Sequence, residues 1–133
     1  MKMSTRGRYA LIVMIDLAKN YAKNDYLSLK EISEKENISL KYLEKIMMLL
    51  NKAKFLEVSR GNTGGYRLKN DPSTYKIGDI LRVTEGNLAP IHCVSKGGEC
   101  QKSSMCETMP FWFGLYNEIN EYVDSKTLAD FLG

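Results

Sequence analysis

The stretch FLEVSRGNTGGYRLK, residues 55–69, decides the fold of this chain. Apolar and polar residues alternate over 55–60 and again over 66–69, which is typical of strands with one buried face. The glycines between the two runs, Gly61, Gly64 and Gly65, give the backbone freedom that a hairpin loop needs. A phosphate-binding loop would end in Lys followed by Ser or Thr, so the segment predicts a two-stranded antiparallel wing instead.

Two short helices are predicted before this wing. Ser28 and Glu31 form a capping box that starts a helix ending near Glu36. After a tight turn, Ser39 is expected to cap a second helix, whose apolar residues recur at three- and four-residue spacing: Leu40, Leu43, Ile46, Met47 and Leu50. This order is that of a helix-turn-helix, although by itself it also fits a generic three-helix bundle. The wing favours the helix-turn-helix.

The core of the domain is predicted from an apolar run over residues 9–18, which indicates a buried helix from about Thr5 to Tyr21. We therefore expect a mainly α fold, a winged helix-turn-helix with a two-stranded β wing, over residues 1–84. A cysteine loop should follow over residues 85–109, and a long dimerisation helix with a short tail over residues 110–133.

The composition is that of a soluble globular protein, with 133 residues, 44% hydrophobic and 26% charged, and no apolar run near membrane-spanning length. Asp16 interrupts the apolar stretch near the N-terminus and no small-residue cleavage site follows, so we expect a cytoplasmic protein without a signal peptide or membrane contact. The net charge is only +3, but basic residues concentrate over 41–69 and acidic residues over 99–130. This asymmetry indicates a nucleic-acid face on the N-terminal part.

Three segments resemble one family of bacterial transcription regulators. STRGRYA at residues 4–10, ISLKYLE at 38–44 and SRGNTGGYRL at 59–68 look like the Rrf2 family, the group of IscR, NsrR and CymR, and the similarity covers nearly the whole chain. The resemblance implies a homodimer that reads a palindromic operator in double-stranded DNA. It also implies that Ser39, Lys41, Tyr42 and Glu44 face DNA from the second helix and that Arg60 contacts the minor groove from the wing.

Two further basic residues join the expected DNA interface because of their charge and position. Lys45 is expected on the exposed side of the second helix, which would be the DNA-recognition helix, and Arg67 lies in the wing. A guanidinium there can enter a minor groove and contact phosphates. An enzyme is not expected, because His92 is the single histidine and no nucleophile–base pair or carboxylate dyad stands out.

The chain has three cysteines, Cys93, Cys100 and Cys106, which lie among Gly, Ser, Lys, Glu and Gln. A structural cysteine would have apolar neighbours, so this cluster indicates metal or redox chemistry in a reducing cytoplasm. The spacing alone does not name the metal, since it differs from zinc knuckles and from both ferredoxin patterns. A zinc site that includes His92 and a bare thiol sensor beside nearby lysines are both open alternatives.

The family resemblance favours an iron–sulfur cluster on the three cysteines, with a 2Fe–2S cluster preferred to a 4Fe–4S cluster. The chain departs from the family at the fourth ligand: Met109 stands where IscR-like members have histidine, and Arg8 where NsrR-like members have aspartate. An incomplete ligand set would suit a labile sensor. We therefore expect a regulator of iron–sulfur assembly, iron, redox or nitric-oxide response genes. The alternative is a cluster-free thiol sensor that regulates cysteine or sulfur metabolism.

Residues 110–133 predict a helix that starts at Pro110, a position where a helix tolerates proline. Such a helix would hold two recognition helices about one duplex turn, roughly 34 Å, apart. The alternative is an apolar stripe that covers only the chain's own core. Ser125 is expected to cap a final short helix. The stripe proposed as the dimer interface consists of Trp112, Leu115, Tyr116, Ile119 and Val123.

Overall fold

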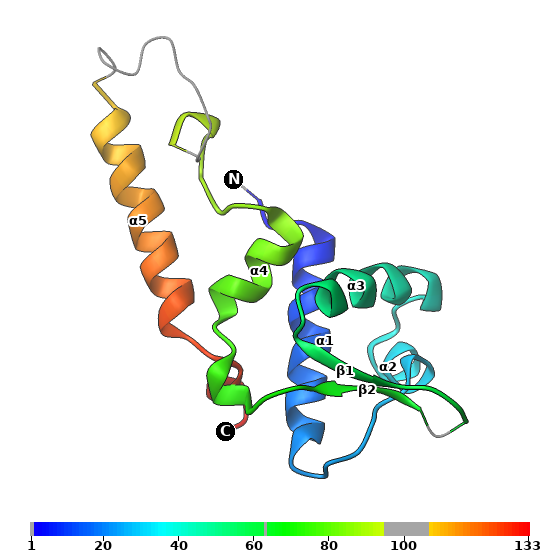
Figure 1. Cartoon of the computed structure of the whole chain (residues 1–133). Coiled ribbons are helices and arrows are strands. Elements are labelled where there is room, and N and C mark those ends of the chain that lie inside the picture. Colours follow the sequence, from blue (N-terminus) through cyan, green and yellow to red (C-terminus); the bar gives the residue numbers. More distant parts are fainter. Residues whose placement is uncertain (1, 63, 95–106) are drawn as a thin grey trace.

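The computed structural model describes residues 2–62, 64–94 and 107–133. These residues form a mainly helical fold with a two-stranded sheet, which confirms the predicted fold class (Figure 1). Over the same residues, no helix combines the length and the apolar character needed to cross a membrane. The elements are α1 (Thr5–Tyr21), α2 (Leu29–Glu36), α3 (Leu40–Lys52), β1 (Leu56–Ser59), β2 (Gly65–Leu68), η1 (Pro72–Thr74), α4 (Ile77–Glu85), η2 (His92–Val94), α5 (Met109–Ser125) and η3 (Leu128–Phe131).

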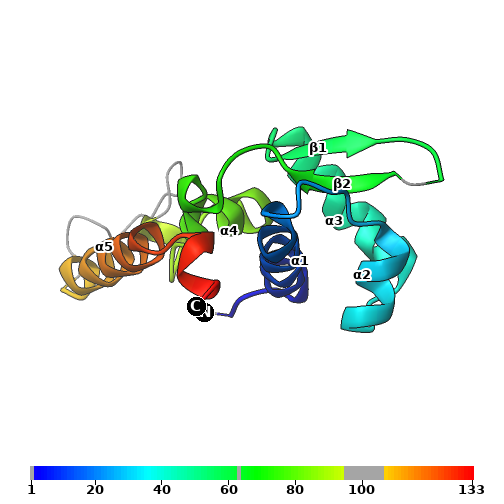
Figure 2. The same cartoon turned by 90° about the horizontal axis from the view of Figure 1, so that it is seen from below.

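Helix α1 is the centre of the fold, as the apolar run predicts. Ser4 caps it by accepting a hydrogen bond from the Gly7 amide (3.0 Å). Two views agree that α1 lies between α2 and α3 on one side and α4 on the other (Figure 1, Figure 2). Its inward side chains are fully buried: Ala10, Val13, Met14 and Leu17. Burial of each of the three larger ones contributes about 1.5–3 kcal/mol of hydrophobic stabilisation, and that of Ala10 contributes less.

Helices α2 and α3 form the predicted helix-turn-helix. In the capping box of α2, Ser28 accepts a hydrogen bond from the Glu31 amide (3.1 Å) and Glu31 accepts one from the Ser28 amide (3.2 Å). Asn37 ends the helix in the left-handed region (φ 56°), which Asn tolerates. Ser39 then caps α3 by accepting a hydrogen bond from the Tyr42 amide (3.2 Å). The predicted helix starts and the turn are therefore confirmed.

The inner face of α3 packs nearly as predicted. Leu40 is the exception, because it is 47% exposed. It is the first residue of the helix and lies beyond the edge of the core, although its spacing would place it on the buried face. The buried residues of α3 are Leu43, Ile46, Met47 and Leu50.

Strands β1 and β2 form the predicted wing, which lies alongside α3 (Figure 2). They pair antiparallel with Leu56 opposite Leu68. The wing is joined to the body at Leu27, whose backbone exchanges two hydrogen bonds with Tyr66 (2.8 and 2.9 Å). Gly65 is required there, because its φ is 157° and a Cβ would clash with the Leu27 carbonyl group.

Helix α5 is attached to α4 through its C-terminal half. Arg82 of α4 donates two hydrogen bonds to the Asp124 carboxylate (2.8 and 2.9 Å) and one to the Asn120 side chain (2.8 Å). The other end of α5 extends away from the body formed by α1 to α4 (Figure 1). The long C-terminal helix is thus present and is fixed at one end.

The tail after α5 folds back on the core. Its short helix η3 is capped by Thr127, whose amide donates to the Asp130 carboxylate (2.8 Å) in a capping box. The predicted cap at Ser125 is wrong, because α5 continues through that residue. Leu128 of η3 is fully buried, and its amide donates to the Tyr75 carbonyl oxygen (3.1 Å).

Candidate DNA interface and cysteine loop

The solvent face of α3 carries three of the residues predicted to contact DNA, Lys41, Glu44 and Lys45. Lys41, Glu44, Lys45 and Met48 recur at three- and four-residue spacing, and all are exposed, Met48 to 71%. Side chains at this spacing share one face of a helix. This face therefore presents two cations, one carboxylate and one thioether.

The other two residues predicted on α3 are partly engaged in the fold. Ser39 is exposed, and its hydroxyl is the acceptor that caps the helix. Tyr42 was expected to face solvent, but it is half-buried, and its ring meets that of Tyr9 in α1 edge to face at a centroid distance of 5.6 Å. An aromatic pair of this kind ties the N-terminal end of α3 to α1.

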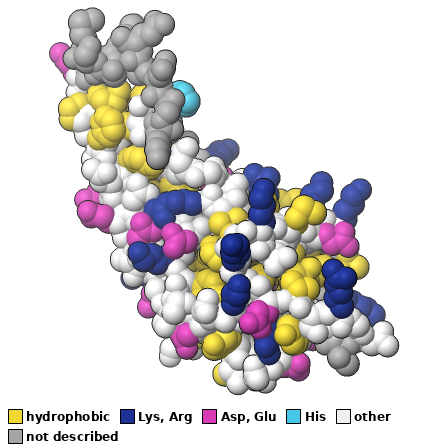
Figure 3. All heavy atoms as spheres, viewed as in Figure 1, with side chains coloured by type: hydrophobic (Ala, Val, Ile, Leu, Met, Phe, Trp, Pro, Cys, Tyr) yellow, Lys and Arg dark blue, Asp and Glu magenta, His cyan; other side chains and the backbone are white. Residues whose placement is uncertain are grey.

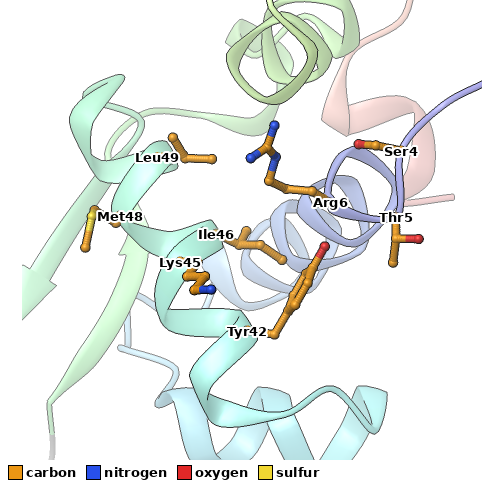
Figure 4. A pocket seen from close by; sticks show the side chains of 8 residues that line it. All are labelled: Ser4, Thr5, Arg6, Tyr42, Lys45, Ile46, Met48 and Leu49. Carbon is orange, nitrogen blue, oxygen red and sulfur yellow. The ribbon is translucent and has the colours of Figure 1, made fainter.

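A hollow of about 470 Å³ lies between the middle of α3 and the first turn of α1. Figure 4 shows Tyr42 reaching from α3 toward α1, with Arg6 between the two helices. Sequence reasoning assigned no role to Thr5 or Arg6. The available signal was the pair Arg6 and Arg8 at the start of the predicted buried helix. The hollow is lined by Ser4, Thr5, Arg6, Tyr42, Lys45, Ile46, Met48 and Leu49.

The two arginines of the wing differ in their surroundings. Arg60 is exposed directly after β1. Arg67 is half-buried: its Nε and Nη2 atoms each lie 2.8 Å from Glu57 Oε2, and its guanidinium lies 4.5 Å from the centre of the Tyr26 ring. The hydrogen bond to Glu57 raises the pKa of Arg67. Arg67 therefore stabilises the base of the wing, and a contact between Arg67 and DNA stays a prediction.

Positive charge gathers on the side of the molecule formed by α3 and the wing. Figure 3 shows Lys and Arg side chains spread over this side, with few acidic ones among them, whereas acidic side chains follow α5. A polyanion is attracted to such a face and repelled by the other. The basic residues of segment 41–69 are Lys41, Lys45, Lys52, Lys54, Arg60, Arg67 and Lys69.

The cysteine segment connects α4 to α5. After α4 the chain turns at Gly86 (φ 82°) and runs to η2, which contains Cys93. Cys93 is half-buried, its neighbour Val94 is buried, and η2 lies beside the start of α5 (Figure 1). Cys100 and Cys106 lie outside the described residues. In the part of the chain that the structure describes, no group of three or more His, Cys, Asp or Glu side chains is placed to hold a metal ion.

The positions predicted for a fourth cluster ligand carry no typical iron ligand. Met109 is buried as the first residue of α5, which is the environment of a packing residue. Arg8 is exposed on α1. His92 and Glu107 are exposed near the two ends of the segment that contains the cysteines. Three thiols therefore stay the predicted donor set, a set that fits an iron–sulfur cluster with an outside ligand or a thiol switch.

The apolar stripe of α5 is divided between the chain's own core and the surface. Ile119 and Val123 pack against the core. Trp112, Leu115 and Tyr116 are half-buried in the part of α5 that extends from the body. The intrachain alternative thus accounts for one end of the stripe, and dimerisation through the other end stays a prediction. Exposed aromatic side chains are also present on α5: Phe111 (65%), Phe113 (46%) and Tyr122 (66%).

Comparison with known proteins decides the family. Residues 3–133 match the model of the Rrf2 family, described as an iron-dependent transcriptional regulator. This chain belongs to the Rrf2 family. One Rrf2 relative, the HTH-type transcriptional regulator IscR of Vibrio vulnificus (strain YJ016), is 35% identical over 132 residues, which cover 99% of this chain and 77% of the relative.

Two solved structures resemble this Rrf2 protein over nearly its whole length. CymR, the global cysteine regulator of B. subtilis, gives a TM-score of 0.83 at 36% identity, covering 99% of this chain and 96% of CymR. IscR of T. potens gives a TM-score of 0.80 at 36% identity, covering 99% of this chain and 86% of that IscR chain. The chain is therefore a DNA-binding transcription regulator and not an enzyme. Equal identities do not separate an IscR-like regulator from a CymR-like one.

Proposed function

We propose that this Rrf2 protein binds a palindromic operator as a homodimer, and that an iron–sulfur cluster on Cys93, Cys100 and Cys106 controls this binding. The exposed face of α3 is the observation that supports DNA binding. It lies beside the hollow at α1 and on the positively charged side of the molecule. An α-helix of this kind fits the major groove of B-form DNA.

Each exposed group on this face suits a particular contact with DNA. The Glu44 carboxylate can accept a hydrogen bond from cytosine N4 in the major groove. Lys41 and Lys45 can donate to guanine or to phosphate oxygens. Arg60, exposed directly after β1, would contact the adjacent minor groove or its phosphates. Glu44 thus serves discrimination between bases, whereas the cations mainly serve affinity.

Dimerisation is proposed because one recognition helix reads only one half-site. The free end of α5 suits this role, since Trp112, Leu115 and Tyr116 are only half-buried by their own chain and a second copy would cover them. Ile119 and Val123 would then continue the interface into the body of each subunit. The two recognition helices would be held at a spacing set by the paired α5 helices.

The cofactor is proposed from the donor set, since three thiolates are typical ligands of iron–sulfur clusters. We expect a 2Fe–2S cluster rather than a 4Fe–4S cluster. When bound, the cluster supplies sensitivity to oxidants, nitric oxide or iron supply. The chain connects this site to DNA binding, because the cysteine segment runs from the end of α4 to the start of α5 and its short helix η2 contacts α5. A changed ligation state would therefore act on α5 and on the spacing of the recognition helices.

A second candidate function is a cluster-free thiol regulator of cysteine or sulfur metabolism. Two observations favour it: the similarity to the cysteine regulator CymR, and the presence of Met109 and Arg8 where fourth ligands are expected. In this case reversible oxidation of the cysteines would replace cluster chemistry. The DNA-binding face would be the same in both candidates.

Selection of duplexes from a random pool tests the DNA-binding proposal. We expect enrichment of an inverted repeat whose half-sites are about one helical turn apart, roughly 10 base pairs or a multiple of this. An enriched sequence without two-fold symmetry would contradict the homodimer. No enrichment in any redox or iron state would contradict sequence-specific binding.

A further inference from the structure

The last turn of α4 holds the first turn of α1 through hydrogen bonds between distant parts of the chain. Glu85 Oε1 accepts hydrogen bonds from the Ser4 backbone amide (3.1 Å) and from the Ser4 hydroxyl. The same hydroxyl accepts one from the Gly7 amide (3.0 Å). Arg6 Nη2 donates to the Thr84 carbonyl oxygen (2.9 Å). We call these five residues the α1–α4 latch.

Gly7 makes the close approach of the two helices possible. A Cβ at Gly7 would clash with the Glu85 carboxylate and lie 3.2 Å from Thr84 Oγ1. Glycine within a helix normally lowers helix stability relative to alanine. Its presence at this position is explained by the latch, because any larger residue would displace Glu85.

The latch forms one wall of the hollow on the DNA-binding face. Ser4 and Arg6 line this hollow together with Tyr42 and Lys45 of the recognition helix (Figure 4). The hydrogen bonds from Ser4 and Arg6 to α4 therefore fix the position of α1 relative to the residues that approach DNA. The cap at Gly7 and the Tyr9–Tyr42 ring contact also help to order this wall.

The other side of the latch faces the segment that leads to Cys93. Glu85 is the last residue of α4, and the chain continues through Gly86 toward η2. A second hollow, of about 440 Å³, lies at this point between the N-terminus, the segment after α4 and α5. Glu85 thus borders both the first turn of α1 and the cysteine segment. This hollow is lined by Lys2, Met3, Glu85, Asn87, Leu88, Ala89, Ile119 and Val123.

We propose that Glu85 is a positioning residue for DNA binding, which holds the first turn of α1 as a wall of the DNA-facing hollow and joins that wall to the segment carrying Cys93. The inference rests on the DNA-binding face proposed above. Glu85 acts here as a hydrogen-bond acceptor. Its negative charge by itself opposes the approach of DNA. Positioning of α1 by Glu85 therefore strengthens DNA binding, whereas the charge of Glu85 weakens it, and substitution can separate the two effects.

The test compares wild-type, Glu85→Ala, Glu85→Gln and Glu34→Ala proteins in binding to the selected operator. Glu34 is exposed on α2 and gives the same change of charge outside the latch. Charge alone predicts tighter binding for both alanine variants. The proposal predicts that Glu85→Ala binds about 2- to 10-fold more weakly, the range expected for a lost hydrogen-bonded anchor. Glu85→Gln keeps an acceptor oxygen and should retain most of the affinity.

The dependence of affinity on salt separates positioning from a general loss of stability. Arg6 is exposed on this wall, and as part of the proposal we expect its guanidinium to contact a DNA phosphate while Nη2 holds Thr84. If the first turn of α1 is no longer held, this phosphate contact weakens, and the slope of log affinity against log salt concentration should fall by up to about one. Variants that only lower the folded fraction would keep the slope of the wild type. Circular dichroism and sedimentation on the same samples establish that each variant is folded and has the wild-type assembly state.

Ser4→Ala perturbs the same contacts from α1 and keeps the test decisive if Glu85→Ala fails to fold. We expect a loss similar to that of Glu85→Ala, and little added loss in the double variant, because both remove the same hydrogen bond. Folded Ser4→Ala and Glu85→Ala proteins that bind as tightly as the wild type, or more tightly, would overturn the inference. A wild-type protein without operator binding would instead overturn the proposed function.

Discussion

Replacing Arg82 by alanine should loosen α5 from α4, and the structure sets the expected magnitude. The Arg82 guanidinium contacts Asp124 at two points, and the two side chains are 29% and 35% exposed. A two-point contact between charged groups is stronger than an ordinary surface pair, but water at this exposure screens it. We therefore expect a coupling free energy between Arg82 and Asp124 of about 1 kcal/mol.

A double-mutant cycle measures this coupling free energy. Urea unfolding followed by circular dichroism would be compared for wild type, Arg82→Ala, Asp124→Asn and the double variant. Arg82→Lys is the matched control: it keeps the charge but loses the forked geometry, and it should lose most of the coupling. A coupling free energy below about 0.3 kcal/mol lies within ordinary additivity and would show that Arg82 and Asp124 do not hold α5 to α4.

The same pair predicts a dependence of stability on pH. The hydrogen bond from Arg82 lowers the pKa of Asp124 below its ordinary value of 3.8. A carboxylate whose pKa is lowered by folding contributes stability above the ordinary pKa, and this contribution is lost as the pH falls through the lower value. The coupling should therefore be full at neutral pH and vanish once Asp124 is protonated. A coupling that is unchanged by acid would contradict an ionic origin.

Three further substitutions test other parts of the account. Glu44→Ala should relax discrimination by roughly 1–3 kcal/mol at one base pair of each half-site, because its carboxylate reads cytosine N4; an unchanged preference over a panel of operator variants would exclude Glu44 as a base reader. Leu115→Glu should give a folded monomer in sedimentation, because an unpaired buried charge costs several kcal/mol, and a persistent dimer would place the interface elsewhere. Gly7→Ala should lower the free energy of unfolding by roughly 1 kcal/mol, because the added Cβ would clash with the Glu85 carboxylate. In an open helix the same change stabilises by roughly 0.5–1 kcal/mol, so a rise in the midpoint of thermal unfolding would contradict the close approach of Glu85.

Much of the fold could be predicted because its signals are local. The capping box at Ser28 and Glu31, the cap at Ser39 and the glycines of the wing each act over a few residues, and the structure has them as predicted. The surroundings of Arg67, in contrast, could not be predicted from local signals. Its partner Glu57 faces it across the wing only because the strand register places the two residues opposite each other. The alternating pattern predicts two strands but does not fix such a pair.

The parts that sequence reasoning missed depend on tertiary contacts. Tyr42 was expected on the open face of α3, but Tyr9 of α1 lies within reach of its ring. Ser4 and Glu85 are 81 positions apart, and no local pattern connects them. For the cysteines, residue type indicates the chemistry, whereas the full ligand set depends on Cys100, Cys106 and a fourth group that the local pattern does not specify.

The iron and acid-labile sulfide content of protein purified without air, together with its visible spectrum, shows whether the three cysteines hold an iron–sulfur cluster. We expect stoichiometric iron and sulfide with the absorption of an iron–sulfur cluster. Serine at Cys93, Cys100 or Cys106 should remove most of the iron and leave the helical circular dichroism intact. Colourless wild-type protein without iron and sulfide, but with operator binding that responds to thiol oxidation, would contradict the cluster and support the thiol regulator.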